Sequence, residues 1–241
     1  MPGIDSLSPT TLIMATAIMM LGAAIQSAVG IGLALAAAPL LTLLEPRFVP
    51  GPMLCASIVL ALATAWRERT AIAQDQLNTS LLGLVIGTGI GASALTIITP
   101  DILPKVFGVF VLIAVAISVS GFSLQPTLLA LVLGGTASGI MGTMIGIHGP
   151  AIALVYQNVA PARARATLGA FFTVGYLITV LALVWIGVFG STDLALSVIL
   201  TPGVLLGWAI GPKLTPFLDP RRTRASILTL SALTACANLL K

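Results

Sequence analysis

The chain has 241 residues, of which 58% are hydrophobic and 7% are charged. A soluble domain carries about 25% charged residues, so this chain has too little charge to cover a surface in water, and most of it must lie in lipid. The net charge of +4 does not indicate a nucleic-acid partner, because the basic residues fall in short loops between apolar runs. The apolar runs are continuous rather than alternating, which argues against a β-barrel and predicts an all-α integral membrane protein.

The first half of the sequence contains five apolar segments. Residues 11–29 form an uncharged run of spanning length, without the basic start of a cleaved signal peptide, and the run breaks at Gly30-Ile31-Gly32. The next run, 33–44, is too short to cross a membrane at about 1.5 Å per helical residue. The remaining segments of this half cover 52–66, 77–98 and 106–120.

The second half repeats this order. A glycine-rich segment, 127–145, breaks at Gly146–Pro150 and is followed by a short run, 151–159. Three further segments cover 167–189, 194–210 and 227–240, with basic loops before the first and the last of them. Glycines spaced by four residues recur in both halves, and we predict that they are packing seams between helices. These glycines are Gly83, Gly87 and Gly91, and Gly203, Gly207 and Gly211.

An ungapped shift of 116 positions superposes the landmarks of the two halves. Gly30-Ile31 falls on Gly146-Ile147, and Thr99-Pro100 falls on Thr215-Pro216. We therefore predict two membrane repeats, at residues 10–121 and 126–240. Each repeat has five segments, so the second copy is expected to be inverted relative to the first.

The distribution of charge agrees with an inverted pair. With both termini placed on the outer side of the membrane, eight basic residues fall on the inner side and three on the outer side, as the positive-inside rule requires. The inside set is Arg67, Arg69, Arg163, Arg165, Lys213, Arg221, Arg222 and Arg224, and the outside set is Arg47, Lys105 and Lys241. The short segments are then either re-entrant hairpins or parts of broken spans, and their breaks are expected to meet near the midplane.

The two breaks are the predicted binding site. Irregular backbone at membrane depth must be covered by protein or line a cavity, and matching breaks in inverted halves are typical of transporters. Helices starting after the breaks would direct their N-termini at an anion. The predicted substrate-binding residues are Gln26, Gly30, Gly32, Gly142, Thr143, Gly146, His148, Gly149 and Pro150. His148, the only histidine, is also the candidate proton carrier, although a packing role is the simpler alternative, as interhelical hydrogen bonding is for Gln26.

Three stretches resemble the sulfite exporter family of membrane permeases, also called TauE/SafE. They are QSAVGIGLALAAAPLL at 26–41, SGIMGTMIGIHGPAIALVYQN at 138–158 and RARATLGAFF at 163–172, with RER at 67–69 in addition. The resemblance covers essentially the whole chain. It implies a bacterial inner-membrane permease for sulfite, thiosulfate, sulfonates or related small organic anions.

The function predicted from these features is secondary transport of a small anion by alternating access. The partners expected are the anion, the lipid bilayer, a proton or other coupling ion, and a second copy of the chain in a homo-oligomer. An anion channel with the same site and a purely structural membrane protein remain alternatives. An enzyme is not expected, since the sequence has one histidine, no carboxylate inside an apolar segment and no metal or cofactor motif.

Overall fold

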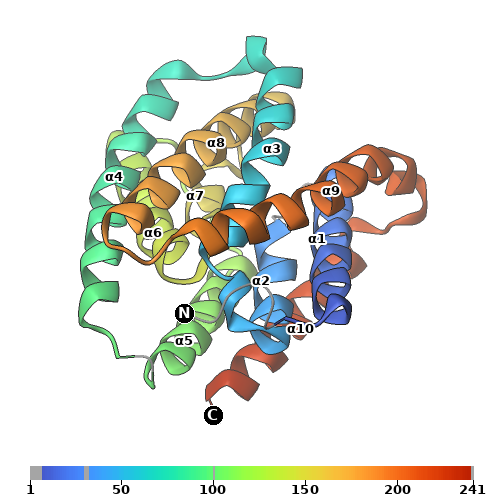
Figure 1. The fold of residues 1–241 in the computed structure, drawn as a ribbon. Helices are drawn as coiled ribbons and strands as arrows, with labels where there is room; N and C mark the ends of the chain where they lie inside the picture. Colours follow the sequence, from blue (N-terminus) through green and yellow to red (C-terminus); the bar gives the residue numbers. More distant parts are fainter. Residues whose placement is uncertain (1–6, 30–32, 100, 240–241) are drawn as a thin grey trace.

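The computed structural model describes residues 7–29, 33–99 and 101–239. Within these residues the chain folds into α-helices and short 3-10 turns, without a β-strand, which confirms the all-α prediction. Figure 1 shows the helices in chain order. They are α1 (Pro9–Val29), α2 (Leu33–Leu44), α3 (Gly51–Arg67), α4 (Gln74–Ile97), α5 (Leu103–Val119), α6 (Leu128–Ile145), α7 (Gly149–Tyr156), α8 (Pro161–Trp185), α9 (Ser191–Leu214) and α10 (Pro220–Leu239).

Several helices are long and apolar enough to cross a membrane. In the described part of the chain these spans are Pro9–Ala28, Gln74–Ile97, Leu128–Ile145, Pro161–Trp185 and Ser191–Phe217. Large apolar side chains lie open on the outside of the bundle; Ile97 is 80% exposed and Trp185 is 89% exposed. Contiguous apolar surface of this kind is stable in lipid rather than in water. The protein is therefore a multi-pass membrane protein.

Two basic stretches that the sequence placed in loops are helical, and that detail of the prediction was wrong. Arg163 and Arg165 belong to the start of α8, and Arg221, Arg222 and Arg224 belong to the start of α10. Pro161 and Pro220 begin these helices, in the position where a missing N–H costs nothing. At α10 the carboxylate of Asp219 accepts hydrogen bonds from the backbone N–H groups of Arg221, at 2.8 Å, and Arg222, at 3.1 Å.

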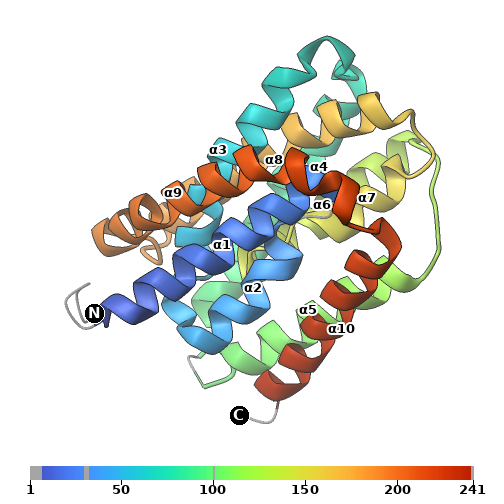
Figure 2. The ribbon, with the colours of Figure 1, turned by 90° about the vertical axis from the view of Figure 1, so that its right-hand side faces the viewer.

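The glycine ladders pack helices against each other, as predicted. A Cβ placed on Gly87 of α4 would lie 2.0 Å from the carbonyl oxygen of Thr136 in α6. A Cβ on Gly207 of α9 would lie 2.2 Å from the carbonyl oxygen of Met20 in α1, the helix that runs beside α9 in Figure 2. A shift of 116 positions carries α1 onto α6 and α4 onto α9, so the pair of α1 and α9 corresponds to the pair of α6 and α4. The division into two repeats and their inverted orientation in the membrane stay predictions.

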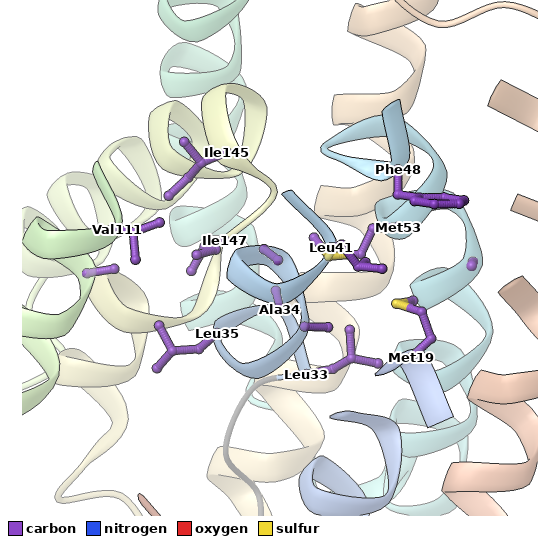
Figure 3. Packing of buried hydrophobic residues seen from close by; sticks show 14 of the residues in the cluster. Met19, Leu33, Ala34, Leu35, Leu41, Phe48, Met53, Val111, Ile145 and Ile147 are labelled. Carbon is purple, nitrogen blue, oxygen red and sulfur yellow. The ribbon is translucent and has the colours of Figure 1, made fainter. Parts of the chain in front are cut away.

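The interrupted segments form helix pairs, α1 with α2 and α6 with α7. At the second break Gly146 has a φ of +77°, a left-handed conformation that suits glycine, and its N–H donates to the carbonyl of Gly142 at 2.9 Å. α7 then packs beside α6, since a Cβ on Gly134 of α6 would lie 3.1 Å from Cγ2 of Val155 in α7. Leu33, Leu35 and Ile147 share one buried apolar cluster, so the start of α2 lies near the second break (Figure 3).

Candidate functional site

A cavity of about 230 Å³ is lined by residues of both interrupted pairs, and we call it the hairpin cavity. Gln26, Ala34 and Leu35 line it from α1 and α2, and Ile147, Gly149, Pro150, Ala153 and Gln157 line it from the second break and α7. The wall is completed by Ser118 of α5, Leu168, Phe172 and Tyr176 of α8, and Arg224 and Leu228 of α10. Residues of both interrupted pairs therefore border one cavity.

A second cavity, of about 320 Å³, lies between α1, α3, α8 and α9, and we call it the side cavity. Its lining residues are Gln26, Ser27, Ala28, Ala61, Thr64, Arg67, Arg165, Leu168, Gly169, Phe172 and Trp208. Gln26, Leu168 and Phe172 belong to both linings. These three side chains form the partition between the cavities.

Gln26 connects the two arms of the first interrupted pair. It lies three residues before the C-terminal end of α1, and its Oε1 accepts a hydrogen bond from the backbone N–H of Leu33, the first residue of α2. One of the free N–H groups at the start of α2 is thereby satisfied by a side chain. Gln26 also has a carboxamide NH₂, a hydrogen-bond donor on a side chain that lines both cavities.

The start of α7 is the second helix N-terminus on the hairpin cavity. Gly149 and Pro150 form its first turn, with proline at a position that favours helix initiation. His148 is the N-cap residue, but its side chain accepts no hydrogen bond from the helix. The first N–H groups of α7 are therefore not capped by a side chain and carry the positive end of the helix dipole.

His148 lies behind this wall rather than in it. Its side chain is 1% exposed, its Nε2 is 3.1 Å from the Oγ1 of Thr179, and its ring packs edge-on against Tyr176 with 5.0 Å between centroids. Its carbonyl accepts a hydrogen bond from Ser138 Oγ at 2.5 Å. Its Nδ1 has no hydrogen-bond partner among the described residues. His148 thus ties the second break to α6 and α8.

Other predicted site residues also contact protein. A Cβ on Gly142 would lie 2.0–2.3 Å from atoms of the His148 ring, so this glycine provides the space that the ring occupies. The hydroxyl of Thr143 donates to the carbonyl of Gly139 at 2.8 Å, on the face of α6 that meets α4. A Cβ on Gly146 would lie 2.5 Å from Cε of Met53. The structure places none of these residues in the cavity lining.

The predicted residues therefore separate into three groups. Gln26, Gly149 and Pro150 line the hairpin cavity, whereas Gly142, Thr143, Gly146 and His148 are packed against other parts of the protein, within the second interrupted pair or against α3, α4 and α8. Gly30 and Gly32 lie outside the described residues. A ligand role for the second and third groups stays a prediction.

Sequence reasoning missed several residues of the cavity wall. Phe172 and Leu168 lie within the RARATLGAFF stretch but carry no chemical signal beyond being apolar. Ser118 was an ordinary residue at the end of a segment. Arg224 was counted only as one of several basic residues that set the topology, and no pattern distinguishes it from its neighbours Arg221 and Arg222.

The side cavity contains arginine side chains that share a carboxylate. Arg165 Nε lies 2.9 Å from Glu68 Oε1, and Arg67 Nη2 lies 3.8 Å from the same oxygen. Glu68 follows α3, so this network connects the end of α3 to the start of α8. Among the described residues, no group of three or more histidine, cysteine, aspartate or glutamate side chains is placed to hold a metal ion.

Two interrupted helix pairs around one cavity, inside a bundle of apolar helices, define a class of multi-pass membrane proteins to which many secondary transporters belong. The sequence identifies the family within that class. Residues 15–237 match the family described as sulfite exporter TauE/SafE, and this chain belongs to it. A search of curated proteins and a search of solved structures each found no match.

Proposed function

We propose that this protein is a secondary transporter that carries a small anion, such as sulfite, thiosulfate, an organosulfonate or another organic acid, across the bacterial inner membrane. The observation that carries the proposal is the shared cavity: Gln26 and Leu35 line it from one interrupted pair, and Gly149 and Pro150 line it from the other. Membership in a family of membrane transporters supports the same conclusion.

The chemistry of the cavity favours an anion. The uncapped N–H groups at the start of α7 and the carboxamide NH₂ of Gln26 are hydrogen-bond donors, and helix N-termini stabilise negative charge. In the described part of the chain, the residues that line the hairpin cavity include no aspartate or glutamate. In the proposed site the anion lies between Gln26 and the start of α7, with Gly30 and Gly32 at the first break.

The proposed mechanism is alternating access between two repeats, residues 10–121 and 126–240, of inverted orientation. In this arrangement both termini are periplasmic, and the cavity faces that contain Arg67, Arg165 and Arg224 lie toward the cytoplasm. The membrane potential, negative inside, assists export of an anion by about 2.3 kcal/mol per unit charge at 100 mV. Uptake would require a coupling ion, for which His148 is the proposed proton carrier.

Transport is tested with the purified full-length protein in proteoliposomes. Radiolabelled sulfite, thiosulfate and methanesulfonate should each be tried as the internal and as the external solute. A transporter is expected to show saturation and counterflow, in which unlabelled anion on one side accelerates uptake of labelled anion from the other. Flux that is linear in concentration and lacks counterflow would instead support an anion channel. Absence of flux for every anion would contradict the proposal.

The inverted orientation has its own test. Single cysteines at positions 69 and 101, in a background with Cys55 and Cys236 replaced by alanine, should react with a membrane-impermeant thiol reagent from opposite sides of the membrane. Both positions lie beyond the ends of apolar helices, α3 and α4. Labelling of both from the same side would exclude the proposed topology without affecting the transport measurement.

A further inference from the structure

Among the described residues that line the hairpin cavity, Arg224 is the one arginine or lysine. It lies in the second turn of α10, and its Nη2 donates a hydrogen bond to the carbonyl oxygen of Ser118 at 2.5 Å. That carbonyl is in the last turn of α5, where carbonyl groups lack partners within the helix and carry partial negative charge. The guanidinium group is therefore held at the cavity wall by the end of a neighbouring helix.

The charge of Arg224 is not balanced by a carboxylate. Within residues 7–29, 33–99 and 101–239, the ion pairs that form do not include Arg224, and the nearby Asp219 pairs with Arg222 at 3.9 Å. A guanidinium has five N–H donors, and the bond to Ser118 occupies one of them. The hairpin cavity thus has one positive charge with donor groups to spare.

The side cavity is different in this respect. Its Arg165 is paired with Glu68 at 2.9 Å, and its Arg67 lies 3.8 Å from the same carboxylate. These arginines connect α3 to α8 and part of their charge is cancelled. A larger volume and a larger number of arginines therefore do not make the side cavity the better anion site.

The remaining wall of the hairpin cavity indicates which anions fit. Leu35, Ile147, Leu168, Phe172 and Leu228 contribute apolar surface, while Gln26 and Gln157 contribute carboxamides. A planar guanidinium pairs well with two oxygens of one carboxylate, sulfonate or sulfite group. One positive charge balances one negative charge, whereas a second negative charge would remain unpaired against apolar walls at a high desolvation cost.

We infer that Arg224 contacts the substrate in the hairpin cavity and that this cavity takes a singly charged oxyanion with an apolar substituent. The inference rests on the transport function proposed above and adds to it the residue that binds the negatively charged group of the substrate. Arg224 selects for charge, the Gln26 and Gln157 amides contact further oxygens, and the apolar wall accommodates the uncharged part of the ligand.

The test uses three probes of similar shape and different charge: dimethyl sulfone, which is neutral, methanesulfonate, which has one negative charge, and sulfate, which has two. Affinities are measured by calorimetry on the full-length protein in lipid nanodiscs. Wild type is expected to bind methanesulfonate more tightly than either of the other probes. Arg224→Gln should weaken methanesulfonate binding by about ten- to a hundredfold, as expected for loss of charged hydrogen bonds, and Arg224→Lys should have an intermediate effect.

Arg222→Gln is the matched control, because Arg222 lies two residues away on the same helix and outside the hairpin cavity. It should leave the Kd for methanesulfonate unchanged. Elution as a single species in gel filtration establishes that each variant is folded, and Arg224→Lys retains a donor for the Ser118 carbonyl if Arg224→Gln does not fold.

The outcomes separate the two proposals. Equal methanesulfonate affinity in wild type and in Arg224→Gln or Arg224→Lys would overturn the role of Arg224 and leave anion transport standing. Tighter binding of sulfate than of methanesulfonate would overturn the preference for a single charge. A wild-type protein that binds neither anion and gives no anion flux in proteoliposomes would overturn the proposed function together with this inference.

Discussion

In each interrupted helix pair a polar side chain from one arm contacts the other arm, but the two pairs use different side chains. The shift of 116 positions places Gln26 on Gly142 and Gly32 on His148. In the first pair the polar side chain belongs to the first arm, and Gln26 reaches from α1 to the N–H of Leu33. In the second pair it belongs to the second arm, and the ring of His148 fills the space beside Gly142 of α6.

This exchange leaves the two polar groups in different surroundings. Gln26 borders both cavities, whereas His148 is 1% exposed and bound to Thr179 of α8. The first pair thus has its polar group at the cavities, where we propose that it contacts the ligand, while the second pair uses its polar group to hold its own arms and α8 together. The predictions below test this division of roles.

The largest effect is expected from Gly142→Ala. The added Cβ would lie 2.0 Å from the His148 ring, which cannot move without losing its contact with Thr179. We expect the free energy of unfolding to fall by about 3 kcal/mol, at the upper end for overpacking of a core. Gly89→Ala is the control, since among the described residues no atom of another helix would lie within 4 Å of its Cβ, and reversible unfolding in a detergent titration measures both variants. Equal stability of the two would contradict the packing of the ring against Gly142.

Thr179→Val should have the next largest effect. It removes the partner of His148 Nε2 at nearly constant volume and leaves a buried polar atom unpaired, which costs about 2 kcal/mol. Thr173→Val is the matched control on the same helix, because the hydroxyl of Thr173 bonds only to the carbonyl of Gly169, at 2.8 Å. If His148 also carries a proton, Thr179→Val should shift the pH profile of transport and Thr173→Val should not. The same loss of stability in both variants would argue against a specific role for the pair.

A double variant measures the coupling between the arms of the second pair. His148→Ala alone removes the ring and its bond to Thr179, but in a Gly142→Ala background it also removes the clash. The two losses of stability should therefore be less than additive, with a coupling energy of about 1–2 kcal/mol in a double-mutant cycle. Strict additivity would mean that the ring and the glycine do not share the same space.

The smallest effect on stability, and the clearest on transport, is expected at Gln26. Gln26→Ala removes the acceptor for the Leu33 N–H and should cost about 1 kcal/mol, as loss of a helix cap does. Gln26→Glu keeps an acceptor there and should retain wild-type stability, because a carboxylate is favourable at a helix N-terminus.

Anion affinity at this position should follow the opposite order. Gln26→Glu places a negative charge in the wall of the hairpin cavity, so its KM for transported anion should rise above that of Gln26→Ala. The comparison is made in proteoliposomes at one pH and one ionic strength. A Gln26→Glu protein that transports as wild type does would remove Gln26 from the proposed site.

Much of the architecture follows from the sequence because the forces that set it are local. Apolar runs of fixed length become helices in lipid, since each run must satisfy its own backbone hydrogen bonds. The break at Gly146–Pro150 is visible because glycine takes the left-handed conformation and proline starts a helix. The ladder through Gly83, Gly87 and Gly91 was assigned correctly to a packing seam, since close approach of two backbones requires small residues at that spacing.

The direction in which a side chain points was decided by tertiary structure alone. His148 and Pro150 are two residues apart, yet one is covered by α6 and α8 and the other lines the hairpin cavity. The neighbours of a residue on its own helix do not reveal which other helix covers it. The same limit explains why Gly142 and Thr143 were grouped with Gly149 as site residues.

Arg224 shows the limit most clearly. By sequence it is equivalent to Arg221 and Arg222, and all three were counted alike in the charge distribution from which the topology was predicted. It lines the hairpin cavity because the end of α5 lies beside the start of α10 and the Ser118 carbonyl accepts its guanidinium. The sequence by itself determined the apolar helices and the break at Gly146–Pro150, because local forces set them, whereas the contact between α5 and α10, 106 positions apart at this hydrogen bond, decided which charge faces the cavity.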